Sequence, residues 1–484
     1  MGRNREVPHL YEKLAQSLAE AIASGALRPG DRLPSVRSFA SQRRVSIATV
    51  LQAYLHLEND GLVEVRPKSG HFVRRRLLPA PAEPRLLKGP SAPGKVAVST
   101  GVAALRESMR DAAVVPLGSA VIDPSLLPIR ALNLRLASIA REMSTAGAAY
   151  DAPPGLPGLR RQLARRSVSW GLALHEDEFL TTLGGMEALN LSLRATTRPG
   201  DTVAVETPTY FGVLQAIEDL GLRAVEIPSR PREGMDLDAL EASLKISPVK
   251  AVVAMPTVSN PLGCTMSDGD KERLVKLLAR RDLPLIEDDV YGELSFDGTR
   301  PRPAKAWDDG GRVLLCGSVS KTMAPGYRVG WLSAGRYTEA VRRLKFSSTV
   351  ANPTLPQLAV AEFLASGGYD RHLRRLRAQL YAQVDRTREA IAASFPSGTR
   401  VSAPSGGFVL WLELPAQVDA YALQARALEK KIAIAPGPIF SARGRYKNCI
   451  RLSCGVPWSP RIENALGLVG ALATMLAGAA RKSA

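Results

Sequence analysis

From Pro116 onward, short runs of apolar and β-branched residues alternate with segments of helical periodicity. The predicted strands include FLTTL, TVAVE, AVVAM, LPLIED and RVLLCGS, and the predicted helices include LVKLLAR. This alternation predicts an α/β fold with a mainly parallel sheet and helices on both faces. Beyond about Tyr369, the predicted helix LRRLRAQLYAQVDRTREAI and the predicted strand GGFVLWLEL indicate a smaller α+β subdomain. We therefore expect one large domain over residues 116–484.

Three helical segments and a hairpin are predicted near the start of the chain. Apolar residues recur at helical spacing over Leu10–Ser24, Val36–Gln42 and Ile47–Asp60. Ser46 is a suitable N-cap for the third helix, and Gly61 is a suitable stop. The letters that follow, LVEV, PKSG and HFV, predict two short strands joined by a turn. Three helices followed by a hairpin are the outline of a winged helix-turn-helix.

The predicted winged helix spans residues 8–74 and is basic. Residues 1–77 carry 13 lysines and arginines against 7 aspartates and glutamates, a net charge of about +6, and the whole chain carries +18. This balance favours a polyanion such as DNA as partner, although a solvated basic surface would give the same count.

Residues 75–115 form the predicted linker between the two domains. The segment begins RRLLPAPAEPRLLKGPSAPGK, which is rich in proline and lacks periodicity, and it continues loosely to Val115. A linker of this length spans roughly 30 Å or more.

The composition excludes several classes of protein. Hydrophobic residues make up 45% and charged residues 23% of the 484 residues, as in ordinary globular proteins. No apolar run approaches the roughly 20 residues of a membrane span, and the N-terminus has no apolar secretion signal, so we expect a cytoplasmic protein. The four cysteines form no CxxC pair, which predicts buried free thiols and no metal site.

Polar, aromatic and glycine residues follow five of the predicted strands at their carboxyl ends. Open α/β sheets bind ligands at these ends. Each feature alone has an ordinary structural explanation: a tight turn, a core aromatic or an Asn-Pro turn. The residues are Gly185, Met186, Tyr210, Asn260, Asp288, Asp289, Tyr291, Ser318, Ser320, Lys321 and Arg328.

Taken together, these residues match a phosphorylated pyridine aldehyde. A lysine can form an imine with the aldehyde. A carboxylate beside the ring nitrogen keeps the nitrogen protonated, so that the ring can draw electrons. Amide and phenol groups can hold the ring hydroxylate, and serines with an arginine can neutralise the phosphate.

The letters SVSKTMAPGYRVGW at Ser318–Trp331, preceded by NPLG and DDVY, carry a family resemblance. Residues from about 116 to 478 resemble a fold-type I, class I aminotransferase domain that binds pyridoxal 5′-phosphate. Residues from about 8 to 74 resemble the GntR-type winged helix. The combination is similar to the MocR subfamily of bacterial transcriptional regulators, and the resemblance covers nearly the whole chain.

The resemblance implies a role for each residue of the cofactor ring site. Lys321 matches the Schiff-base lysine. Asp288 matches the partner of the pyridine nitrogen, with Asp289 as the alternative. Tyr291 and Asn260 match the groups that hold the ring hydroxyl. The stacking aromatic of the family is matched by Tyr210.

The resemblance also implies phosphate and substrate contacts. Tyr150 resembles a tyrosine that reaches the neighbouring subunit's phosphate, the alternative being a core tyrosine. Arg451 matches an arginine that binds a substrate carboxylate through a bidentate pair. At two positions that often carry a hydroxyl or amide in this family, the chain has glycine and methionine, which offer only backbone donors. The matched phosphate contacts are Gly185, Met186, Ser318, Ser320 and Arg328.

In the winged helix, the resemblance points to two groups of DNA contacts. The start of the third helix meets base edges in helix-turn-helix docking. The family often has arginine at the position of Ile47, so direct reading of guanine there is in doubt. The base-edge candidates are Ser46, Thr49 and Gln52; the phosphate or minor-groove candidates are Arg37, Arg43, Arg44, Lys68, Ser69 and Gly70.

We expect a ligand-responsive transcription factor that binds operator DNA. Its C-terminal domain would form a homodimer, bind the cofactor on Lys321 and sense an amine or amino acid that displaces Lys321; the free cofactor could instead be the signal. The linker permits domain exchange between subunits. The main alternative is a genuine aminotransferase with a DNA-binding appendage, and a third is an interaction module that has lost the cofactor.

Overall fold

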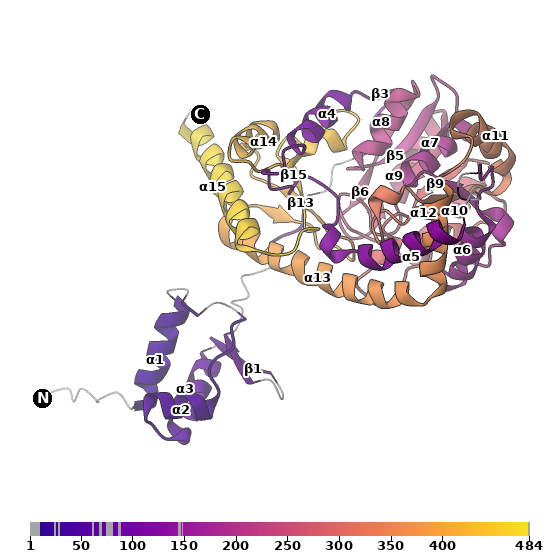
Figure 1. Cartoon of the computed structure of the whole chain (residues 1–484). Coiled ribbons are helices and arrows are strands. Elements are labelled where there is room, and N and C mark those ends of the chain that lie inside the picture. Colours follow the sequence, from indigo (N-terminus) through magenta and orange to yellow (C-terminus); the bar gives the residue numbers. More distant parts are fainter. Residues whose placement is uncertain are drawn as a thin grey trace, which may run out of the picture. The chain divides into compact units, whose positions relative to one another are not determined.

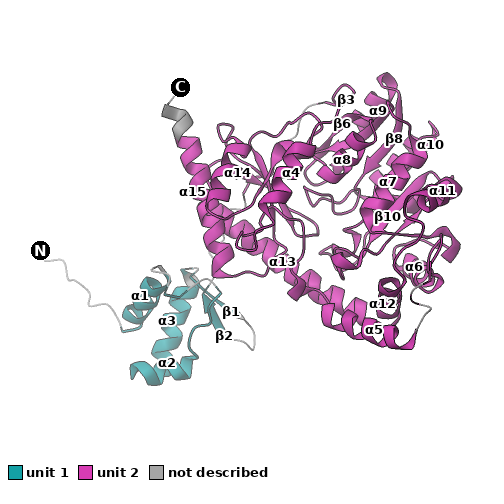
Figure 2. Ribbon diagram, turned by 45° about the horizontal axis from the view of Figure 1, so that its top comes forward, with its two compact units in different colours: residues 1–80 teal, residues 81–484 magenta. Residues whose placement is uncertain are grey.

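The computed structural model divides the chain into two compact units, residues 1–80 and 81–484 (Figures 1 and 2). Among the residues it describes, no helix is long and apolar enough to cross a membrane. The described residues are 10–23, 26–27, 30–60, 62–66, 70–73, 81–85, 89–143, 147 and 149–482.

The first unit contains the three helices and the hairpin that the sequence predicts. Val50, Tyr54 and Leu57 form the inner side of the third helix and are buried against Leu14 and Leu18 of the first. The regularly spaced apolar residues therefore form a separate hydrophobic core within this unit. The elements are α1 (Leu10–Ala23), α2 (Val36–Arg43), α3 (Ile47–Asn59), β1 (Val63–Arg66) and β2 (Gly70–Val73).

The second unit is built on a nine-stranded mixed sheet whose central pairings are parallel and whose outer pairings are antiparallel, which confirms the predicted α/β class. Four neighbouring strand pairs, β6–β5, β5–β8, β8–β9 and β9–β10, are parallel. The order across the sheet is β3 (Gly94–Lys95), β6 (Arg223–Arg230), β5 (Thr202–Thr207), β8 (Val249–Ala254), β9 (Leu285–Asp288), β10 (Val313–Ser318), β11 (Gly330–Ser333) and β4 (Leu180–Thr182), with β7 (Gly234–Met235) paired to β6.

Helices cover both faces of this sheet because its strands are apolar on both sides. Val203 and Val205 of β5 belong to a core cluster with residues of α7 and α8, whereas Ala204 belongs to a cluster with residues of α9 and α10. Beyond them, α12 packs against α5 and α6. The helices are α5 (Ile129–Glu142), α6 (Pro157–Ser169), α7 (Gly185–Thr196), α8 (Phe211–Asp219), α9 (Leu237–Ile246), α10 (Asp268–Ala279), α11 (Thr338–Thr349) and α12 (Thr354–Ala365).

The direction of the strands brings the predicted strand-end residues to one edge. Strand β11 runs antiparallel to both β10 and β4, so β4 points the same way as β10. The carboxyl ends of β4, β5, β8, β9 and β10 therefore lie on the same side of the sheet, as the prediction of one shared site requires.

A smaller α+β subdomain follows Tyr369, as predicted. Its four-stranded sheet is antiparallel, in the order β12 (Arg400–Val401), β13 (Val409–Glu413), β15 (Cys449–Ser453) and β14 (Ala435–Pro436). The helices are α13 (Gly368–Ser394), α14 (Ala420–Glu429) and α15 (Pro460–Lys482).

The predicted linker over residues 75–115 is wrong for its second half. Strand β3 pairs antiparallel with β6, and residues Ser99–Ser108 form a further helix, α4. Val102 and Leu105 of α4 are completely buried in the core of the large sheet. This part of the chain therefore belongs to the second unit. Two buried apolar residues in a ten-residue helix are too few to give a clear periodic signal in the sequence.

Candidate functional site

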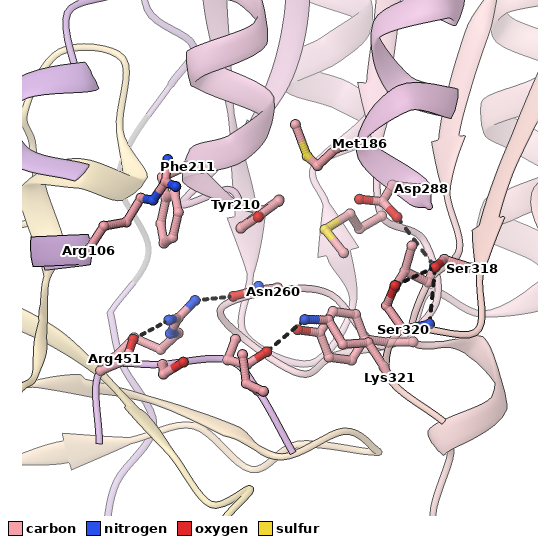
Figure 3. A pocket seen from close by; sticks show the side chains of 18 of the residues that line it. Arg106, Met186, Tyr210, Phe211, Asn260, Asp288, Ser318, Ser320, Lys321 and Arg451 are labelled. Carbon is pink, nitrogen blue, oxygen red and sulfur yellow. Dashed lines mark hydrogen bonds between the residues drawn. The ribbon is translucent and has the colours of Figure 1, made fainter. Parts of the chain in front are cut away.

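A cavity of about 300 Å³ opens at the carboxyl edge of the large sheet (Figure 3). All eleven residues predicted for the ring, phosphate and carboxylate contacts within one subunit line it. They are Gly185, Met186, Tyr210, Asn260, Asp288, Tyr291, Ser318, Ser320, Lys321, Arg328 and Arg451.

Lys321 follows the end of β10 and points its amine into this cavity (Figure 3). Its Nζ donates a hydrogen bond of 2.7 Å to the carbonyl oxygen of Ala120 and lies 5.8 Å from the centroid of the Tyr291 ring. Burial, together with the positive charges of Arg451 and Arg328, lowers the pKa of Lys321 to about 8. A substantial fraction of the amine is therefore neutral near pH 7–8 and available as a nucleophile.

The two neighbouring aspartates at the end of β9 have different surroundings. Asp288 lines the cavity, and its Oδ1 accepts the N–H of Val290 at 3.3 Å. Asp289 is instead ion-paired with Arg300 and does not line the cavity. Burial, with a smaller contribution from Asp289, raises the pKa of Asp288 to about 6. Of the two alternatives left open by the sequence, Asp288 is the carboxylate that faces the cavity.

Tyr291 and Asn260 both line the cavity, where the Tyr291 ring lies near the Lys321 amine and Asn260 accepts a hydrogen bond from Arg451. The Tyr291 hydroxyl is buried and forms no hydrogen bond of normal geometry among the described residues, although the Asn260 side chain lies close enough to interact with it. Burial raises the pKa of this hydroxyl, so it remains a donor at neutral pH. A buried polar atom without a partner is costly, and a ligand oxygen in the cavity would satisfy it. The Tyr291 hydroxyl is therefore suited to donate to the ring oxygen of the expected cofactor.

The predicted phosphate contacts surround the N-terminus of α7. Gly184 has φ +80°, a conformation that favours glycine, and a Cβ there would lie 2.4 Å from Nη2 of Arg328, so a larger residue would also displace this guanidinium. The hydroxyls of Ser318 and Ser320 lie 2.8 Å apart, and Arg328 Nη1 donates to Ser320 Oγ at 3.3 Å. The first N–H groups of a helix have no intrahelical acceptor, so α7, which begins at Gly185, adds backbone donors for an anion.

Arg451 is a buried guanidinium without an acidic partner. Its side chain donates to the carbonyl oxygen of Gly118 at 2.7 Å and to Asn260 Oδ1 at 3.2 Å, while its Nε has no hydrogen bond among the described residues. Arg451 is 1% exposed, and burial lowers its pKa to about 10. No described carboxylate forms an ion pair with it. The guanidinium is therefore positioned to bind an anion that enters the cavity.

The two remaining predicted tyrosines differ in position. Tyr210 lines the cavity, with its ring centroid 4.9 Å from that of Phe211, and its stacking on a cofactor ring stays a prediction. Tyr150 lies outside the cavity and is 86% exposed. The alternative of a core tyrosine is therefore wrong, and a role toward a neighbouring subunit stays a prediction.

Sequence analysis missed part of the cavity wall. Arg106 and Met109, at the C-terminal end of α4, and residues 118–121 line the cavity beside the predicted set. The predicted linker over residues 75–115 hid Arg106 and Met109, whereas residues 118–121 follow it and carry no charged or aromatic side chain that would mark a site. The helical spacing of Val102 and Leu105 is the one signal in the sequence that could have found α4.

The start of α3 in the first unit has the predicted N-cap. Ser46 Oγ accepts the backbone N–H of Thr49 at 3.0 Å, and the two side-chain hydroxyls lie 2.7 Å apart. These two candidate base contacts are therefore hydrogen-bonded to each other in the free protein, whereas Gln52 is exposed. Ile47, at the position where the family often has arginine, is 50% exposed on this helix.

The basic candidates of the first unit lie on its surface. Arg37, Arg43 and Arg44 are exposed, and the Arg43 guanidinium lies 5.4 Å from the centroid of the Phe39 ring. These arginines are accessible to phosphates.

The hairpin holds the other predicted contacts. Lys68 and Ser69 lie outside the described residues. Gly70 has φ +107°, and a Cβ there would lie 3.4 Å from Nε of Arg32. Arg32 is exposed beside the hairpin and is a further candidate that the sequence did not indicate.

The cysteines and acidic residues give no sign of a metal site in the part of the chain that is described. All four cysteines are buried free thiols, and no cluster of three or more His, Cys, Asp or Glu residues is arranged around a common point there.

Comparison with known proteins gives matches for both units. Residues 125–466 match the family "Aminotransferase class I and II", and residues 10–73 match "Bacterial regulatory proteins, gntR family". The chain is 41% identical to the uncharacterized HTH-type transcriptional regulator YdcR of Escherichia coli over 96% of this chain and 98% of that protein. It is 38% identical to the uncharacterized HTH-type transcriptional regulator YjiR of Escherichia coli, over 95% and 98%.

A solved structure shares the fold of the second unit. The α-aminoadipate aminotransferase LysN of Thermus thermophilus, complexed with N-(5′-phosphopyridoxyl)-L-leucine, superposes with a TM-score of 0.73 at 28% identity. The match covers 78% of this chain and 97% of LysN.

Proposed function

The chain belongs to the aminotransferase class I and II family and carries that domain in a MocR-type fusion to a gntR-family DNA-binding domain, and from this we propose that it is a transcriptional regulator controlled by pyridoxal 5′-phosphate and an amino acid. One observation carries the proposal: a single chain joins a helix-turn-helix unit to a cavity in which Lys321 lies among polar groups that lack partners. Relatives that match over nearly their whole length bear the name of HTH-type regulators, which supports a regulator rather than an enzyme.

The residues of the cavity fit pyridoxal 5′-phosphate. When bound, this group supplies an aldehyde that condenses with primary amines and a ring that takes up electrons. Lys321 offers an amine with a lowered pKa, and Asp288 offers a carboxylate for the ring nitrogen. Tyr291 offers an unpaired hydroxyl for the ring oxygen. The α7 N-terminus with Ser318, Ser320 and Arg328 offers donors for the phosphate.

Arg451 supports an amino acid as the effector. The Arg451 guanidinium is buried in the cavity wall, and its Nε forms no hydrogen bond and no ion pair with a carboxylate among the described residues. A bidentate pair between Arg451 and the effector's α-carboxylate would satisfy the guanidinium. It would also bring the effector's amine toward Lys321, because Asn260 lies between the side chains of Arg451 and Lys321 (Figure 3).

The segment that holds residues 118–121 offers a route from the cavity to the rest of the protein. An effector amine that competes with Lys321 leaves the Lys321 amine free to donate to an acceptor. In the described structure that acceptor is the carbonyl oxygen of Ala120, at 2.7 Å, two residues from the Gly118 carbonyl held by Arg451. Lys321 and Arg451 thus both donate hydrogen bonds to this segment, and the loss of either hydrogen bond alters the position of the segment. Coupling to DNA requires that the two ligand states prefer different arrangements of the protein.

A homodimer is part of the proposal. Tyr150 is a large side chain left 86% exposed outside the cavity of its own subunit. An exposed tyrosine of this kind fits contact with a second copy of the chain, in which it would reach the partner's phosphate site.

A genuine aminotransferase is the second candidate, because the cavity lacks none of the central catalytic side chains. The test mixes the purified, cofactor-loaded chain with individual amino acids and follows the visible absorbance, keto-acid formation and affinity for DNA that the protein selects from a random-sequence pool. A stable spectral change accompanied by altered DNA affinity supports the regulator. Sustained keto-acid production with unchanged DNA affinity supports the enzyme and refutes the regulator.

A further inference from the structure

Arg106 is a second guanidinium in the wall of the cavity that holds Arg451. Figure 3 shows both arginines on the side of the cavity opposite Ser320 and Lys321, with the Phe211 ring beside Arg106. Arg106 is exposed toward this space, and within the described part of the chain no carboxylate forms an ion pair with it. The end of the cavity away from Lys321 therefore carries two positive groups.

Arg106 is held at this place by the packing of α4. The helix has no N-cap side chain of its own, and the carboxylate of Glu218 takes that role. Glu218 Oε2 accepts from the backbone N–H of Val98 at 2.9 Å, and from the N–H and hydroxyl of Ser99 at 3.0 and 2.9 Å. Leu105, the residue before Arg106, is buried in the core. The start and the inner face of α4 are therefore both fixed. The packing of α4 therefore fixes the backbone position from which the Arg106 side chain reaches the cavity wall.

The acidic residues near α4 do not neutralise this arginine. Glu218 is engaged at the other end of the helix. Glu107, the next residue in the chain, pairs with Arg110 at 3.1 Å. The one carboxylate that lines the cavity, Asp288, lies on the side of Ser318 and Lys321 (Figure 3). A ligand that brought two acidic groups, one to each arginine, would balance the charge of this end of the cavity.

We propose that Arg106 binds a second acidic group of the effector, so that the effector is an amino acid with a carboxylate in its side chain. The inference rests on the proposed function, in which Arg451 binds the α-carboxylate. The side-chain carboxylate then lies toward α4, and the amine lies toward Lys321. Phe211 and Met109, which line the same end, pack against the carbon chain between the two acidic groups. Neutral amino acids leave Arg106 without a partner and bind more weakly.

The experiment compares acidic amino acids with their neutral amides, which have nearly the same shape. The cofactor-loaded full chain is titrated with L-glutamate, L-glutamine, L-aspartate and L-asparagine, and the change in visible absorbance gives each affinity. In the unaltered protein, at least one acid should bind about tenfold or more tightly than its amide, since a charge-assisted pair is lost in the amide. Arg106→Gln should reduce this ratio to near one, because the affinity for the acid falls much more than the affinity for the amide. Arg106→Lys should retain part of the preference.

Arg110→Gln is the matched control. Arg110 follows shortly after Arg106 but pairs with Glu107 and does not line the cavity, so this variant should keep the full preference for the acid. Equal affinity for acid and amide in the unaltered protein overturns the inference and leaves the amino-acid sensor standing. A preference that survives Arg106→Gln also overturns it. If neither acids nor amides change the absorbance, and no other amino acid does, the proposed function itself fails, and this inference fails with it.

Discussion

Replacing Arg451 with methionine separates a structural role of this arginine from a ligand-binding role. Burial lowers the pKa of Arg451 from its ordinary value of 12.5 to about 10, so at neutral pH the folded protein holds the charge at a cost of about 3 kcal/mol. The variant removes that cost. It also removes the hydrogen bonds to Gly118 and Asn260, which contribute roughly 1–3 kcal/mol each when charged. The two effects oppose each other.

The free energy of unfolding of the ligand-free protein should therefore change by less than about 1 to 2 kcal/mol. Breaking a buried ion pair would instead cost about 3–5 kcal/mol. Urea unfolding followed by tryptophan fluorescence measures this directly, because all five tryptophans lie in residues 81–484. Affinity for the amino acid should fall by about a hundredfold, as expected for loss of a bidentate guanidinium–carboxylate pair.

Two results would refute this reasoning. A loss of more than about 3 kcal/mol in stability would mean that Arg451 has a structural anionic partner. Unchanged amino-acid affinity in a well-folded variant would mean that the effector carboxylate binds elsewhere. Gln383→Met is a suitable control, since Gln383 is another buried polar side chain of the same unit that does not line the cavity.

Four further predictions follow from the two units. Since the pKa of Lys321 is lowered to about 8, the neutral amine increases with pH. Cofactor capture by the apoprotein, followed by stopped-flow absorbance, should therefore reach half of its maximal rate near pH 8 and level off above about pH 9; a continued rise through pH 10 contradicts the lowered pKa. Asp288→Asn should weaken cofactor binding about tenfold by fluorescence titration, because a charge-assisted hydrogen bond is lost, and unchanged affinity argues against a contact with the ring nitrogen. Arg37→Ala should weaken binding to all DNA sequences and reduce the salt slope by about 1, whereas an unchanged slope excludes a phosphate contact. Ile47→Arg should create a preference for guanine in DNA selected from a random pool, and an unaltered selection would show that this position does not face base edges.

The cofactor-type cavity was predictable because its residues follow directly from the strand pattern. Each predicted strand ends just before its polar residue, and parallel strands deliver those residues to one edge. Lys321 after β10 and Asn260 after β8 are examples, and both line the cavity.

The choice between Asp288 and Asp289 was not predictable from local sequence. Both aspartates fit the same motif, and successive residues of a strand point to opposite sides. The structure distinguishes them through Arg300, whose ion pair with Asp289 leaves Asp288 to the cavity. That partner is set by tertiary folding.

Helix α4 and its contribution to the cavity were only weakly indicated by the sequence, through the helical spacing of Val102 and Leu105. The helix is stabilised by Glu218, more than a hundred residues away, and by burial against the large sheet. Proline-rich composition before it suggested a linker that continued to Val115. Arg106 therefore entered the site only through the structure.

Covalent trapping of the cofactor tests the central claim most directly. The purified full chain is loaded with pyridoxal 5′-phosphate, reduced with borohydride and digested, and the peptides are identified by mass spectrometry. The account predicts a phosphopyridoxyl group on Lys321, and a Lys321→Ala variant that shows neither this label nor the visible absorbance. An unlabelled protein, or a label that resides on another lysine and persists in the variant, would contradict it.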